Sequence, residues 1–239
     1  MKTEVLGICY DNVTMPEALD AARALLQSGT CGYVVTPNAE IAYEALHSEA
    51  LRAVLNGAQL VLPDGAGVVL ASKIVRTPLK QKVAGFDFAM ELLPLLAELG
   101  LRLFLLGSKS GVAEQAAELL QKKHPTLCIC GTADGYFVQD SDAVQVIRAA
   151  RADVVYVCLG APKQEMFMQK NLDDSCAKLM LGLGGTLDVV AGHVRRAPRW
   201  MQKLGLEWLY RLLRQPSRFG RMLRLPKYVF AALKKRWKG

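Results

Sequence analysis

The 239-residue sequence lacks any apolar run that approaches the roughly 20 residues needed to cross a bilayer. Its longest apolar stretches, residues 154–161 and 179–187, are far shorter. The N-terminus turns polar again by Tyr10 and Asp11, so we expect no signal peptide. The three histidines lack ligand spacing, and the six cysteines are scattered through apolar segments. The sequence therefore disfavours a disulfide framework and a zinc site, and we expect no metal and no cofactor.

Two common nucleotide-binding motifs are also missing. The first strand candidate is followed by Cys9-Tyr10-Asp11-Asn12 and not by the G-x-G-x-x-G of a dinucleotide-binding dehydrogenase. Residues 107–111, Gly-Ser-Lys-Ser-Gly, do not match the Walker A pattern. They fit either a loop that exposes N–H groups to a phosphate or a plain tight turn between a strand and a helix.

Acidic residues are nearly absent from the last part of the chain. Residues 195–239 hold fourteen Lys or Arg and one acid, whereas residues 1–194 carry a net charge of −5. We therefore divide the chain into a body, 1–194, and a basic C-terminal appendage, 195–239. A cationic tail on a mildly acidic body predicts a polyanionic partner surface.

Short apolar segments alternate with helical patterns along the body. Strands are predicted near residues 5–9, 32–35, 60–62, 101–106, 127–130, 154–159 and 179–182, and helical patterns lie between most of them. This alternation predicts an α/β fold, a mostly parallel, Rossmann-like sheet with helices on both faces. The carboxyl ends of such strands lie along one edge, where ligands bind.

Polar residues follow two of these strands directly. Asp64 comes after the strand at 60–62 and Pro63, while Thr36 and Asn38 follow the strand at 32–35. Each position also suits a helix N-cap, with Thr36 as the cap of the next helix and Asp64 as the cap of the helix near 68–73. Taken alone, the capping role is the stronger interpretation of Asp64.

Glycine-rich corners follow the other strands, and each could let a ligand approach the backbone. They contribute further candidate binding residues: Gly107, Ser108, Gln164, Glu165, Gly184, Gly185 and Asp188. Asp140-Ser141-Asp142 resembles the D-x-D metal site of many sugar-nucleotide transferases. Because it directly precedes a helical stretch, two helix-capping acids are the stronger interpretation.

The tail mixes cations with apolar and aromatic residues. Arg214, Arg221 and Arg224 recur at helical spacing, and Pro216 and Pro226 are expected to interrupt the helices. The pattern fits an interfacial membrane helix or a basic helix packed on the body, and these stand about even on composition. We expect no nucleic-acid partner, because the tail shows no zinc or RNA-binding motif.

These motifs together resemble the WecG/TagA/CpsF glycosyltransferases over essentially the whole chain. The resemblance is carried by Thr36-Pro37-Asn38, Leu62-Pro63-Asp64-Gly65, Gly107-Ser108, the run 160–165, Gly184-Gly185-Thr186 with Asp188, Arg195-Arg196-Ala197-Pro198 and Trp208-Leu209-Tyr210-Arg211.

The resemblance implies an inverting, metal-independent transferase, closest to the branch that makes the teichoic-acid linkage unit. Such an enzyme would move N-acetylmannosamine from UDP-ManNAc to the 4-hydroxyl of GlcNAc on undecaprenyl diphosphate. It further implies that Asp64 is the general base with Thr36 beside it. Asn38, Gln164 and the glycine corners would match the nucleotide pocket. The tail would dock at the membrane, and its arginines, with Arg214, Arg221 and Arg224 as the candidate substrate-binding residues, would help to close the site.

Several alternatives stay open at this point. UDP-ManNAcA or UDP-glucose could be the donor, and a membrane-surface adaptor without catalysis would also explain the tail. A homo-oligomer is compatible with the sequence. We expect a cytoplasmic protein held peripherally on the inner face of the plasma membrane, because the acceptor is a lipid and the tail is cationic.

Overall fold

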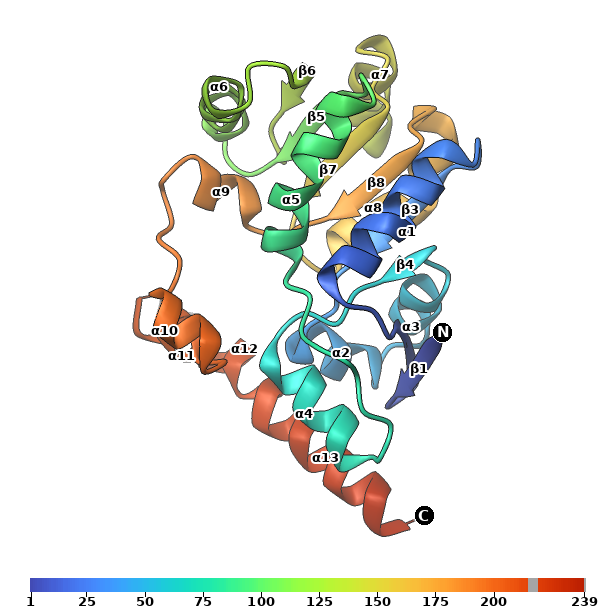
Figure 1. Ribbon diagram of the computed structural model, residues 1–239, viewed down its shortest axis with the longest axis vertical. Coiled ribbons are helices and arrows are strands. Elements are labelled where there is room, and N and C mark those ends of the chain that lie inside the picture. The colour runs from blue at the N-terminus through green and yellow to red at the C-terminus, as the bar shows by residue number, and fades with distance from the viewer. Residues whose placement is uncertain (215–218, 239) are drawn as a thin grey trace.

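The computed structural model describes residues 1–214 and 219–238, without the side chains of residues 211, 221 and 238 (Figure 1). The strands are β1 (Lys2–Val5), β2 (Ile8–Asp11), β3 (Gly32–Val35), β4 (Leu60–Val61), β5 (Arg102–Gly107), β6 (Cys128–Ala133), β7 (Val154–Cys158) and β8 (Leu179–Gly182). The helices of the body are α1 (Met15–Gln27), α2 (Ala39–Ala45), α3 (Glu49–Asn56), α4 (Ala66–Ile74), α5 (Gly85–Glu98), α6 (Val112–Lys123), α7 (Asp140–Ala149), α8 (Lys163–Ser175) and α9 (Thr186–Val190). The C-terminal part holds α10 (Arg199–Lys203), α11 (Glu207–Arg214), α12 (Phe219–Met222) and α13 (Arg224–Lys238).

Six strands form one sheet in the order β4-β3-β8-β7-β5-β6, and every neighbouring pair in it is parallel. The predicted α/β class with a parallel sheet is therefore confirmed. All six carboxyl ends lie on one edge of this sheet, as the parallel pairing requires. Chain segments far apart in sequence consequently meet there.

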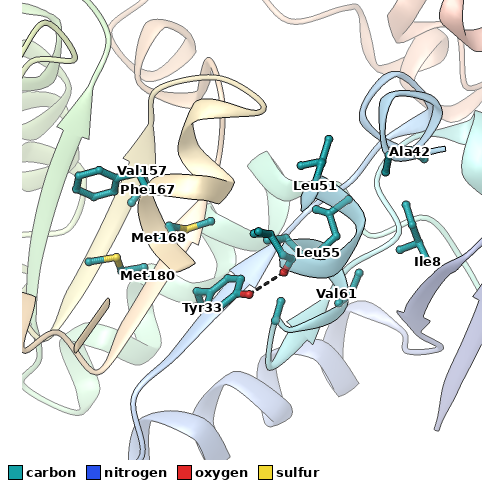
Figure 2. Packing of buried hydrophobic residues seen from close by; sticks show 14 of the residues in the cluster. Ile8, Tyr33, Ala42, Leu51, Leu55, Val61, Val157, Phe167, Met168 and Met180 are labelled. Carbon is teal, nitrogen blue, oxygen red and sulfur yellow. Dashed lines mark hydrogen bonds between the residues drawn. The ribbon is translucent and has the colours of Figure 1, made fainter. Parts of the chain in front are cut away.

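Helices cover both faces of the sheet because successive strand residues point to opposite sides. Val34 of β3 is buried with α1, α5, α6 and α9 on one face, and Val35 with α2, α3, α7 and α8 on the other. Figure 2 shows part of the second layer, where Tyr33 Oη donates to the Val54 carbonyl oxygen at 2.7 Å. The predicted two-sided arrangement is confirmed, and it gives the edge of the sheet a rigid support.

The N-terminal segment differs from the prediction. In place of one strand at 5–9, β1 and β2 form an antiparallel hairpin outside the main sheet. Leu6 and Gly7 adopt φ of 52° and 86° at the turn. Two consecutive residues with positive φ are typical of the tight turn that closes a hairpin, although the leucine at the first position is unusual there.

The last helix packs on the body. In Figure 1, α13 runs beside α4, and its contacts are made with α2 and α4. Tyr228 and Ala232 are fully buried within the same hydrophobic cluster as the second helix layer. Pro226 does not interrupt the helix as predicted, because it lies in the first turn, where a proline removes no helical hydrogen bond. α13 thus contributes to the core of the body, and the division at residue 195 stays a prediction.

Within the described ranges, no helix is both long and apolar enough to cross a membrane.

Candidate functional site

A cavity of about 670 Å³ opens at the carboxyl edge of the sheet. Loops after β3, β4, β7 and β8 line it, together with the start of α5 and residues of the C-terminal part. Its volume lies in the range of small-molecule sites, and its position at the strand ends is where open α/β sheets bind ligands. This cavity is the candidate active site.

Thr36 and Asp64 both line the cavity, as predicted from their place at strand ends. The Thr36 side chain is buried, and its Oγ1 donates to the Gly182 carbonyl oxygen at 3.1 Å, which ties β3 to β8. A Cβ on Gly85 would lie 2.8 Å from Thr36 Oγ1, so α5 can begin here only with a glycine. Thr36 is therefore fixed on two sides.

The helix-capping interpretations turn out differently at the two corners. Asn38, and not Thr36, caps α2, because its Oδ1 accepts from the N–H groups of Glu40 and Ile41 at 2.9 and 3.1 Å. The N-cap of α4 is Gly65, with φ of 85° and no side-chain cap. Asp64 precedes the cap and lines the cavity, so capping does not account for the aspartate there.

Gln164 lies on the cavity wall, but its amide is engaged within the protein. Its Oε1 accepts from the Gly184 N–H at 2.9 Å, and its Nε2 donates to Glu165 Oε1 at 2.9 Å. Glu165 is fully buried behind it, and burial raises the pKa of this carboxyl group. Gln164 consequently holds the Gly184–Gly185 corner, whose two glycines line the cavity.

The corner after β5 stands behind the wall of the cavity. Ser108 Oγ donates to Asp188 Oδ2 at 2.9 Å, and Asp188 itself lines the cavity. A Cβ on Gly107 would lie 2.4 Å from the carbonyl oxygen of Cys158, so this glycine permits close packing of β5 against β7. Asp188 therefore lines the cavity. Gly107 and Ser108 lie behind it, where Ser108 holds the Asp188 carboxylate and Gly107 lets β5 pack against β7.

Two of the predicted arginines line the cavity from the C-terminal part. The Arg214 guanidinium stacks 5.7 Å from the centroid of Tyr210, and Arg224 Nη1 pairs with Glu44 Oε2. The side chain of Arg221 lies outside the described residues. Arg214 and Arg224 thus reach the same cavity as Asp64, although they lie at least 150 positions away in the sequence.

Other cavity residues escaped the sequence reasoning: Glu40, Glu44, Phe86, Arg195, Arg196, Glu207 and Tyr210. The Arg195-Arg196-Ala197-Pro198 and Trp208-Leu209-Tyr210-Arg211 motifs held the only signal for three of them. Glu44 and Glu207 lie on helices and follow no strand directly, so no local pattern marks them.

The metal alternative at residues 140–142 is not supported by the local contacts. Asp142 Oδ2 accepts from the Gln139 N–H at 3.2 Å as part of a capping box, and Asp140 pairs with Lys170 at 3.3 Å. Among the described residues, no group of three His, Cys, Asp or Glu side chains could hold a metal ion. Asp142 thus has the capping role that the sequence favoured, whereas Asp140 is the first residue of α7 and contacts Lys170 instead.

Comparison with known proteins adds independent evidence. Residues 3–239 match the model of the glycosyl transferase WecG/TagA/CpsF family. Similar proteins from Bacillus spizizenii, Bacillus subtilis and Staphylococcus aureus are each named N-acetylglucosaminyldiphosphoundecaprenol N-acetyl-beta-D-mannosaminyltransferase. The Bacillus spizizenii protein is 40% identical over 84% of this chain and 79% of its own length. The other two are 38% and 32% identical, each over 98% of this chain and 92% of their own length. The chain therefore belongs to the WecG/TagA/CpsF family of glycosyl transferases.

Proposed function

We propose that the chain is an inverting glycosyltransferase that moves N-acetylmannosamine from UDP-ManNAc to GlcNAc on undecaprenyl diphosphate. The product would carry a β-1,4 linkage and serve teichoic acid or surface polysaccharide synthesis. The names of the three relatives support the acceptor and the transferred sugar. The observation that carries the proposal is the strand-end cavity in which Asp64, Thr36 and cavity-facing arginines come together.

In this proposal Asp64 acts as the general base. The acceptor hydroxyl oxygen attacks the anomeric carbon of the donor, and the bond from that carbon to the diphosphate oxygen breaks. The hydroxyl proton passes to the Asp64 carboxylate, so a single displacement inverts the anomeric centre. A base placed in this way contributes roughly 10²–10⁴-fold to the rate.

The departing UDP needs stabilisation of its negative charge. Arg195 and Arg214 line the cavity, and within the described ranges no carboxylate is paired with either of them. Guanidinium groups bind phosphate oxygens through charge-assisted hydrogen bonds. We assign these two arginines to the diphosphate, with Gly160, Gly184 and Gly185 allowing the nucleotide close to the backbone.

The lipid acceptor requires the cavity to meet a membrane surface. The C-terminal part exposes several large apolar side chains: Trp200, Leu204, Leu213, Phe219, Phe230 and Trp237. These accompany the cations of residues 195–239, and such a combination favours binding in the interface of an anionic bilayer. We propose peripheral attachment at the inner face of the plasma membrane, which brings the acceptor diphosphate towards the cavity.

A panel of donors tests the proposal. The purified protein is incubated with UDP-ManNAc, UDP-ManNAcA or UDP-glucose and a short-chain lipid diphosphate bearing GlcNAc. We expect a disaccharide product with UDP-ManNAc and at most trace product with the other two. Preferred transfer from either alternative donor would reject the proposed sugar while keeping the reaction type. Donor turnover that does not depend on the acceptor would reject the transferase assignment.

A further inference from the structure

Four charged side chains from three stretches of the chain meet beside the cavity, which two of them, Arg196 and Glu207, line. Arg196 Nη1 and Nη2 pair with both oxygens of Asp87, the second at 3.2 Å, and Nη2 also lies 3.2 Å from Glu207 Oε1. The other oxygen of Glu207 accepts from Lys82 Nζ at 2.9 Å. The Arg196 guanidinium also stacks 4.4 Å from the centroid of Phe86. We call Lys82, Asp87, Arg196 and Glu207 the Arg196 clasp.

The clasp is partly shielded from water. The side chains of Arg196, Glu207 and Lys82 are 18%, 20% and 25% exposed, and that of Asp87 is 38% exposed. Burial alone would raise the pKa of Glu207, but Lys82 and Arg196 outweigh it and lower that pKa. For Arg196, burial is likewise outweighed, and Asp87 raises the pKa of the guanidinium. Hydrogen bonds between charged groups are roughly twice as strong as neutral ones, so this cluster holds its segments firmly.

In helix α11 the apolar side chains of Trp208, Leu209 and Tyr210 are half-buried. None of its described side chains is buried, whereas α13 buries Tyr228 and Ala232. Glu207 is the first residue of α11, and its carboxylate accepts hydrogen bonds from Lys82 and Arg196. Tyr210 and Arg214 lie further along α11 and line the cavity.

The clasp also separates the roles of two neighbouring arginines. Arg196 is neutralised by two carboxylates, so a ligand phosphate would have to displace Asp87 and Glu207 to reach it. Arg195 is exposed, lines the same cavity and has no acidic partner among the described residues. Arg195 is therefore available to a ligand phosphate and Arg196 is not, because only Arg196 of these two neighbours is paired with carboxylates in the folded structure.

We infer that Arg196 is a positioning residue: through Asp87 and Glu207 it fixes α11 over the cavity and thereby places Tyr210 and Arg214. The consequence for turnover rests on the proposed function, but the fixing of α11 does not. The surface pair Arg23–Glu98 offers a matched control. It is also a bidentate arginine–carboxylate pair on α5, with both distances 2.9 Å, but it joins α5 to α1 away from the cavity.

Amide hydrogen exchange on the full-length protein without substrate tests the clasp directly. Arg196→Gln and Asp87→Asn should each accelerate exchange in peptides covering residues 206–214 by at least about tenfold, since a charged hydrogen bond is lost. Arg195→Gln and Arg23→Gln should leave these peptides unchanged. Peptides from β5 and β7 serve as an internal control and should keep wild-type protection in every variant, which separates local release of α11 from unfolding.

A double variant and a kinetic measurement complete the test. If both residues act through one contact, Arg196→Gln with Asp87→Asn should exchange no faster than the more affected single variant. In the transfer assay the single variants should lower kcat by about tenfold and, because Arg214 is assigned to the diphosphate, should also raise the dissociation constant of UDP by about threefold or more. Arg196→Lys keeps the positive charge but loses the bidentate hydrogen bonding of the guanidinium, so it should recover part of kcat.

Wild-type exchange at residues 206–214 in Arg196→Gln overturns the inference. So does faster exchange with unchanged kcat, because α11 would then be held by the clasp without serving the reaction. A protein that transfers no sugar in any form but still shows the exchange pattern contradicts the proposed function and leaves the clasp standing.

Discussion

The packing of α13 leads to a quantitative prediction for two aromatic residues on the same helix. Tyr228 is fully buried in the body core, whereas Phe230, two positions later, is 68% exposed. Removing a large buried side chain costs about 3–5 kcal/mol through lost burial and the cavity left behind. An exposed substitution away from special features usually stays within about 0.5 kcal/mol. Tyr228→Ala should therefore destabilise the whole body, and Phe230→Ala should not.

Urea denaturation followed by tryptophan fluorescence and by circular dichroism measures both variants. Tyr228→Ala should lower the free energy of unfolding by about 3–5 kcal/mol with an unchanged m-value. The same loss corresponds to a fall in Tm of roughly 6–20 °C for a chain of this size. Phe230→Ala, which carries the same helix propensity change, should unfold at the wild-type midpoint.

The reasoning fails if Tyr228→Ala and wild-type protein unfold at the same urea concentration. It also fails if circular dichroism shows two transitions in wild-type protein, one for α13 and one for the sheet. Either result would mean that the C-terminal helix is a separate unit and that the division of the chain at residue 195 is a physical boundary.

Four further predictions concern the site and the surface. Asp64→Asn should keep UDP binding, measured by calorimetry, but lower turnover by roughly 10²-fold or more, because the amide cannot accept the hydroxyl proton; near wild-type turnover would remove Asp64 from the mechanism. Turnover should survive EDTA, since charge stabilisation is assigned to arginines; loss on chelation with recovery on adding Mg²⁺ or Mn²⁺ would contradict this. Glu207 has a lowered pKa, so its contribution to holding α11 is fully present above the ordinary carboxyl value of about 4.3 and is lost as the pH falls through the lower folded-state value. Hydrogen exchange at residues 206–214, corrected for intrinsic rates, should accelerate only below the ordinary titration range of a carboxyl group, whereas acceleration near pH 6 would point to a different group. Phe230→Glu with Trp237→Glu should reduce co-sedimentation with anionic vesicles without changing Tm, because both side chains are exposed; undiminished binding would place the membrane contact elsewhere.

Local sequence determined several strands and helices with good accuracy. Residues 32–35, 112–123 and 179–182 have the bounds predicted for them, since apolar runs and helical periodicity are properties of neighbouring residues. The parallel sheet followed from the alternation of these elements, and with it the meeting of Thr36 and Asp64 at one edge. The catalytic roles came from the family resemblance and stay predictions.

Other features depend on residues that are distant in the sequence. The pattern at 5–9 fits one strand, but a turn at Leu6 and Gly7 makes it a hairpin. The aromatic residues of the tail look alike in composition, yet packing on α2 and α4 buries Tyr228 and leaves Phe230 outside. Arg195 and Arg196 likewise look equivalent in the sequence, yet in the folded structure only Arg196 of the two is paired with Asp87 and Glu207.

The sequence by itself therefore determined the class of fold, the edge that carries the site and most of the strand-end residues that line it. Only the tertiary structure decided the strand order, the burial of α13 and the pairing of Arg196 with Asp87 and Glu207. The physical reason is the range of the interactions. Periodicity and turn chemistry act over a few residues, whereas Asp87 and Arg196 lie 109 positions apart and meet only because the folded body brings them together.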